Sequence, residues 1–155
     1  MKLNKTIFTI VAVATICLVV AIAFVVPRFI QLGNTDSAIV GVRTIVNAAT
    51  TYQTEYGYYP DSLEQMSQLK GTTSSKQNYE WLTNGTWADH RRNGYVFTYR
   101  AFHKKHEGKL DSFTINADPI QPSCTGCWHF FSSEDGVIHM ESDQPALASS
   151  PPLGS

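Results

Sequence analysis

Residues 7–26, IFTIVAVATICLVVAIAFVV, form an uncharged apolar run near the start of the chain. At about 1.5 Å per residue, a helix of this length spans the roughly 30 Å hydrocarbon layer of a membrane, where a single segment satisfies its own backbone hydrogen bonds only as a helix. Lys2 and Lys5 precede the run, whereas only Arg28 closely follows it. This bias in positive charge predicts a cytoplasmic N-terminus and an exported chain after Pro27.

A cleaved signal peptide is the alternative interpretation of the same run. The lysine-rich start, the apolar middle and the small-residue triplet Ala21-Ile22-Ala23 match that pattern. The run is longer, however, than the usual length of about 7–15 residues, and it continues through Val26. We therefore expect a retained single-pass anchor, with membrane lipid around residues 7–26 and the following domain outside the cytoplasm. Either interpretation exports residues 28 onward.

The chain after the anchor has the length of one modest domain with its own core. We expect a cytoplasmic start and transmembrane helix at 1–27, an extracytoplasmic domain at 28–143 and a flexible Pro-, Ser- and Ala-rich tail at 144–155. The net charge of the protein is only −1, which provides no field to attract nucleic acid. Nucleic acid is therefore excluded as an expected partner.

A helical pattern resumes after the anchor. Pro27 predicts a kink, and Gly33 is expected to loosen the helix, because glycine costs about 1 kcal/mol relative to alanine. Beyond it, apolar residues recur at alternating steps of four and three, which places them on one face of an amphipathic helix that ends at Gly57. This helix packing stripe (the stripe) comprises Ala38, Val42, Ile45, Ala49, Tyr52 and Tyr56. The stripe requires a cover from the rest of the domain.

The residues after Gly94 have the two-residue alternation of strands with one buried face. Three-residue spacing over 63–69 predicts a short second helix before them, and residues 79–94 show no clear period. The predicted strands are 95–101 and 112–117, joined by a turn at 107–109, then 128–132 and 137–140, joined through the hairpin signal Asp135-Gly136. An α+β fold follows, in which a long N-terminal helix packs on a small antiparallel sheet.

At this level of detail the sequence resembles the type IV pilins and the major pseudopilins of type II secretion. Residues 42–49 followed by 52–60, YQTEYGYYP, are similar to the region where the long pseudopilin helix ends in a YxxxxGxYP turn. Residues 94–99, 117–119 and 130–138 look like the sheet and final hairpin of these proteins. The resemblance covers most of residues 7–141 and implies a pilin-like fold.

Two features of the family are missing here. Pilins are processed after a Gly and carry Glu at the fifth mature position, where it pairs with a neighbouring subunit. With Pro27 aligned to the helix proline of the family, Lys5 takes the place of that Gly and Ile10 takes the place of that Glu, although Phe8-Thr9-Ile10 is similar to the usual start. The absence of that Glu removes one specific contact between subunits. It also removes the cost of desolvating a carboxylate in lipid.

Cys124 and Cys127 form a C-x-x-C pair that we expect to be a structural disulfide in an oxidising compartment. A redox pair and two free thiols are the alternatives. A redox pair is disfavoured because the two cysteines do not lie between a strand and a helix N-terminus, where the helix dipole would lower the pKa of the attacking thiol. A Cys₂His₂ zinc site with His103 and His106 is a further alternative, although these histidines fit a solvated turn equally well. We assign no metal, calcium or cofactor site.

The sequence contains no recognisable catalytic motif, since it has no nucleophile elbow, no HExxH and no glycine-rich phosphate loop. We therefore expect no enzyme. The resemblance implies a structural or interaction subunit of a type II secretion or type IV pilus-like assembly, with other pilin-like subunits as partners. It also implies that the anchor lies in an inner membrane and that the following domain is periplasmic. The alternatives are a stand-alone tethered or secreted binding domain with this fold and, more distantly, a periplasmic thiol-disulfide or metal-binding protein.

Overall fold

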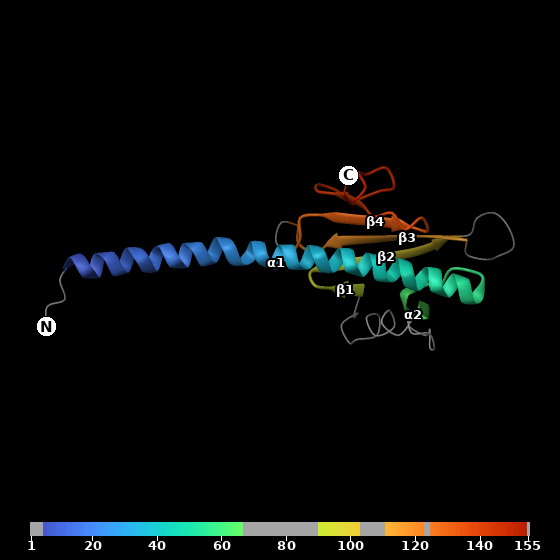
Figure 1. Ribbon diagram of the computed structural model, residues 1–155, viewed down its shortest axis with the longest axis horizontal. Coiled ribbons are helices and arrows are strands. Elements are labelled where there is room, and N and C mark those ends of the chain that lie inside the picture. The colour runs from blue at the N-terminus through green and yellow to red at the C-terminus, as the bar shows by residue number, and fades with distance from the viewer. Residues whose placement is uncertain (1–4, 67–89, 103–110, 123–124, 155) are drawn as a thin grey trace.

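One helix, α1 (Lys5–Tyr56), continues for 52 residues and carries the sheet along its second half (Figure 1). The computed structural model describes residues 5–66, 90–102, 111–122 and 125–154. Within them, the first half of α1 projects alone, and the sheet lies beside the second half (Figure 1). The structure thus confirms the predicted α+β arrangement of a long helix packed on a small antiparallel sheet.

Helix α1 is continuous through both positions where the sequence predicts weakness. Pro27 lies inside the helix, and the helix also includes Gly33, so the expected loosening at Gly33 is wrong. A helical glycine costs about 1 kcal/mol relative to alanine. One residue later, Asn34 Nδ2 donates a hydrogen bond of 2.9 Å to the carbonyl oxygen of Thr125. Such a contact offsets a cost of this size.

Five strands form one antiparallel sheet in sequential order, a meander. They are β1 (Arg91–Arg92), β2 (Tyr95–Phe102), β3 (Ser112–Pro119), β4 (His129–Ser133) and β5 (His139–Glu141). Strands β2 to β5 correspond to the four predicted strands, with ends shifted by one or two residues. Helix α2 (Leu63–Met66) falls within the predicted second helix, whose end lies outside the described residues, as does the predicted turn at 107–109.

The first strand, β1, is an addition that the sequence pattern does not predict. Arg92 pairs with Tyr95, so Asn93 and Gly94 alone connect β1 to β2. Both have positive φ, 45° and 77°, the conformation of a type I′ hairpin turn. Asn and Gly are the residues that adopt this conformation most readily.

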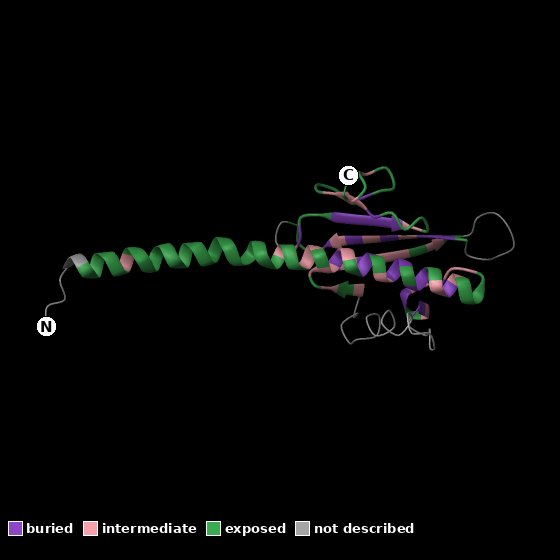
Figure 2. Ribbon diagram, viewed as in Figure 1, coloured by how far each residue is buried: buried purple, intermediate pink, exposed green. Residues whose placement is uncertain are grey.

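The core lies between the second half of α1 and one face of the sheet (Figure 2). Five members of the stripe are buried: Ala38, Val42, Ile45, Ala49 and Tyr52. The sixth, Tyr56, is 51% exposed, contrary to expectation. It lies in the last turn of α1, where its ring packs on Tyr52 with centroids 4.4 Å apart. The sheet contributes the buried side chains of Tyr95, Phe97, Phe113, Ile115, Ala117 and Phe130.

The C-terminal segment, residues 143–154, is folded onto the sheet, so the predicted flexible tail at 144–155 is wrong for the described part. The backbone N–H of Met140 donates to Pro151 O at 2.9 Å, and that of Leu153 donates to Ile138 O at 2.7 Å. On the face away from α1, Asn116 Nδ2 donates to Ala146 O at 3.0 Å. Strand β4 is consequently buried on both faces.

Candidate functional site

The first half of α1 is covered by no other described part of the chain. Every Ile, Leu, Val and Phe side chain from residue 7 to residue 26, which we call the anchor half, is between 47% and 72% exposed. By length and composition α1 is apolar enough to cross a membrane. Apolar surface this continuous is rare on soluble monomers and marks a contact with lipid or with another protein. The anchor half is therefore the first element of the candidate site.

The second element is the junction where α1 enters the sheet domain. Here the loop at residues 125–128 (the junction loop) packs against α1 through Asn34 and Thr125. The Tyr95 hydroxyl donates to Trp128 O at 3.0 Å and lies 3.4 Å from Thr35 Oγ1. Burial raises the pKa of the Tyr95 phenol, so this side chain acts as a neutral hydrogen-bonding group. These bonds hold the loop at a fixed height along the helix.

Two glycines allow the close approach of the junction loop. A Cβ on Gly126 would lie 2.5 Å from Tyr95 Cζ and would overlap the hydroxyl oxygen. A Cβ on Gly94 would lie 2.7 Å from Thr125 Cβ, and the φ of 77° at Gly94 disfavours other residues independently. The sequence at both positions is thus dictated by packing at the junction.

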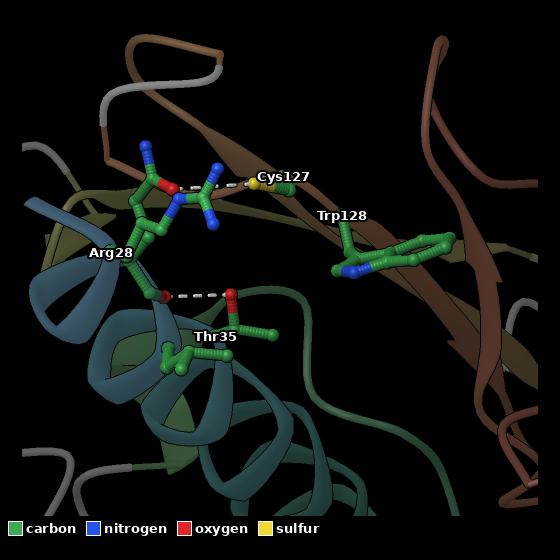
Figure 3. Close-up of a pocket in the computed structure, with 6 residues that line it drawn as sticks. Arg28, Thr35, Cys127 and Trp128 are labelled. Carbon is green, nitrogen blue, oxygen red and sulfur yellow. Dashed lines mark hydrogen bonds between the residues drawn. The ribbon is translucent and has the colours of Figure 1, made fainter. Parts of the chain in front are cut away.

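A groove of about 390 Å³ opens between α1 and the junction loop. Its lining, which defines the groove here, is Arg28, Gln31, Leu32, Thr35, Cys127 and Trp128. Figure 3 shows Arg28 and Trp128 on opposite sides, with Thr35 and Cys127 between them. Cys127 Sγ donates to Gln31 Oε1 at 3.6 Å. The groove is open to solvent, its lining is mainly apolar, and Arg28 is the one positively charged side chain in that lining.

Cys127 is a free, exposed thiol in this structure, and its predicted partner Cys124 lies outside the described residues. The expected disulfide is thus not observed at Cys127, whose sulfur instead takes part in the contact with Gln31. No group of three or more metal-ligating side chains occurs within the described ranges, and His103 and His106 are outside them.

Two polar pairs elsewhere on the sheet have structural partners. His129 Nδ1 lies 2.6 Å from Asp118 Oδ1 on the neighbouring strand, and the side chain of His129 is largely buried. His139 Nδ1 donates to Ser150 O at 2.6 Å, which fixes the C-terminal segment on β5.

The sequence identified the anchor half but not the groove. Arg28 was evident as the charge after the apolar run, whereas Trp128 was assigned only to the start of a strand. Gln31 and Cys127 are 96 positions apart in the chain. No local periodicity relates residues so distant, and only the docking of the junction loop brings them together.

Comparison of the chain with protein-family models, with curated proteins and with solved structures gave no match in any of the three.

Proposed function

We propose that this protein is an anchored structural subunit of a type II secretion or type IV pilus-like assembly. In this proposal the anchor half spans an inner membrane, the N-terminus is cytoplasmic and the sheet domain is periplasmic. One observation carries it: an exposed, uncharged helix continues without interruption into the helix that forms the core of a folded domain. A removable leader would have no structural reason to share one helix with the core.

The anchor half also supports the assembly part of the proposal. Helices in lipid associate through close packing of apolar and small side chains, because the hydrophobic effect no longer drives association there. The anchor half offers Ile, Val and Ala around its full circumference, with Cys17 exposed near its middle. Ile10 occupies the position at which the resembling family carries Glu, so packing rather than a buried charge would hold neighbouring subunits together.

Two native thiols test the orientation. A membrane-impermeant maleimide applied from outside should label Cys127, which is exposed on the sheet domain, but not Cys17 in the anchor half. The Cys124→Ser variant limits the signal to these two sites, and detergent provides the control in which both react. Labelling of Cys17 in intact membranes, or release of the protein by alkaline carbonate, would contradict the anchoring.

Crosslinking tests the assembly. In a Cys124→Ser/Cys127→Ser background, an oxidant should join Cys17 thiols of adjacent subunits. Because successive helical residues point about 100° apart, Ile16→Cys and Leu18→Cys in a Cys17→Ser background probe the other faces of the helix. A single cysteine on a face that contacts a neighbouring subunit should give crosslinked dimers. Cysteines at two such positions in one chain should give a ladder of larger multimers. Monomers from all positions would favour a stand-alone tethered domain.

A further inference from the structure

We propose that the groove binds the phosphate of an anionic phospholipid in the outer leaflet, with Arg28 as the phosphate ligand and Trp128 as the interfacial anchor. The inference rests on the membrane anchoring proposed above and adds a specific ligand to it. The site is built from two segments distant in sequence, α1 and the junction loop.

The position of Arg28 along α1 matches the depth of a lipid phosphate. Residues 7–26 cover about 30 Å, the thickness of the hydrocarbon layer, so Arg28 falls at the level of the headgroups. Arg28 is the only cation between residues 7 and 42, and it forms no ion pair with any described residue. A guanidinium presents paired donors that match a phosphate, so this side chain has both the charge and the geometry required.

The groove has a polar side and an apolar side, which suits an amphiphilic ligand. Arg28, Gln31 and Thr35 provide a polar side, whereas Leu32 and the indole ring of Trp128 provide apolar contact. Trp128 is 38% exposed, and tryptophan is enriched at the boundary between membrane and water, where its ring contacts both phases. The volume of about 390 Å³ lies within the range of roughly 300–1,000 Å³ typical of small-ligand sites.

A second hollow extends the groove toward the membrane. It is lined by Val25, Arg28, Phe29 and Leu32, and thus shares Arg28 and Leu32 with the groove. This lining is apolar apart from Arg28. A phospholipid would place its acyl chain along this hollow and its phosphate at Arg28. A free phosphate ion would leave the apolar lining unused, which is why a lipid is the favoured source.

The test compares lipids retained by the full-length protein after reconstitution. The protein is inserted into phosphatidylcholine vesicles that contain a minor fraction of phosphatidylglycerol, extracted in mild detergent and analysed by native mass spectrometry. Wild-type protein should retain phosphatidylglycerol about fivefold above its share of the bilayer, the effect expected of one cation at a membrane surface. Arg28→Gln should reduce retention to that share, and Trp128→Phe should reduce it partly.

Arg43→Gln is the matched control. Arg43 is also exposed on α1 but lies about 22 Å further along the helix, outside the groove. It should leave retention unchanged. Equal retention by Arg28→Gln and wild type, or equal loss with Arg43→Gln, would overturn the lipid site while leaving the anchoring intact. Displacement of the lipid by inorganic phosphate would also overturn it. Failure of the wild-type protein to insert into pure phosphatidylcholine vesicles would instead contradict the proposed function.

Discussion

Gly126 lies against the ring of Tyr95, so closely that no side chain fits between them. Tyr95 is fully buried and bonded through its hydroxyl to Trp128 O, hence the ring has no free volume into which to move. This contact joins the junction loop to the sheet. It predicts that the smallest possible substitution at residue 126 disturbs the loop and the groove together.

Gly126→Ala should lower the free energy of unfolding by about 2–3 kcal/mol, because overpacking of a rigid site forces the backbone or the ring to shift. Urea unfolding in detergent, followed by circular dichroism, measures the change. Gly33→Ala is the control: a Cβ at Gly33 meets nothing within 4 Å, and alanine favours the helix by about 1 kcal/mol. A Gly126→Ala protein as stable as wild type would show that the junction is looser than described.

Removal of residues 145–155 should destabilise the sheet domain by about 2–4 kcal/mol. The deletion breaks the hydrogen bonds of Met140, Leu153, His139 and Asn116, each worth about 1 kcal/mol. Part of the loss is offset by the entropy that the segment regains.

Asn116→Ala provides a milder version of the same test. It removes only the bond to Ala146 O and should lower the free energy of unfolding by about 1 kcal/mol, with faster proteolysis of the C-terminal segment. If truncation leaves the urea midpoint unchanged, the segment contributes nothing to stability and the original expectation of a loose tail would be restored.

Alkaline pH should unfold the sheet domain. A hydrogen bond with the Tyr58 hydroxyl, together with burial, raises the pKa of Tyr52 to about 12 from 10.0, and burial raises the pKa of Tyr99 further. Above pH 10 the unfolded chain loses these protons and the folded chain keeps them, so unfolding is favoured as pH increases. The contribution of these phenols to the free energy of unfolding should be constant below pH 10. Above pH 10 the free energy of unfolding should fall by up to about 1.4 kcal/mol per pH unit for each such phenol.

Tyr52→Phe should reduce this dependence between pH 10 and 12, and Tyr58→Phe, which removes the hydrogen-bond partner of the Tyr52 hydroxyl, should reduce it as well. Tyrosinate absorbance monitors ionisation, and circular dichroism monitors unfolding. Identical pH profiles for Tyr52→Phe and wild type would contradict the role of the buried phenol.

The sequence was most informative where structure repeats over short distances. The spacing of Val42, Ile45 and Ala49 identified the buried face of α1, and the alternation after Gly94 identified β2 and β3. Strand β1 was missed because it has only two residues, although Asn93-Gly94 is a strong hairpin signal that could have located it. Tyr56 follows the helical repeat, yet its position in the last turn leaves it half-exposed.

The C-terminal segment and the groove depend on tertiary contacts that local patterns do not encode. Composition predicts flexibility for a segment rich in Pro and Ser, but backbone bonds to the edge of β5 order it. Arg28 and Trp128 line the same groove only because the junction loop lies beside α1, and Gly126 lets this loop pack closely on Tyr95. A close approach of this kind is a property of the assembled fold.

Because α1 is one uninterrupted helix of about 78 Å, its two halves are locked in rotational phase. In the proposed membrane-anchored state, the side of α1 on which the sheet lies determines which side of the first half of the helix faces a neighbouring subunit. One residue inserted near Gly33 would turn the two halves by about 100° relative to each other and misalign them. A torque applied to the sheet would likewise be transmitted directly to the first half of α1.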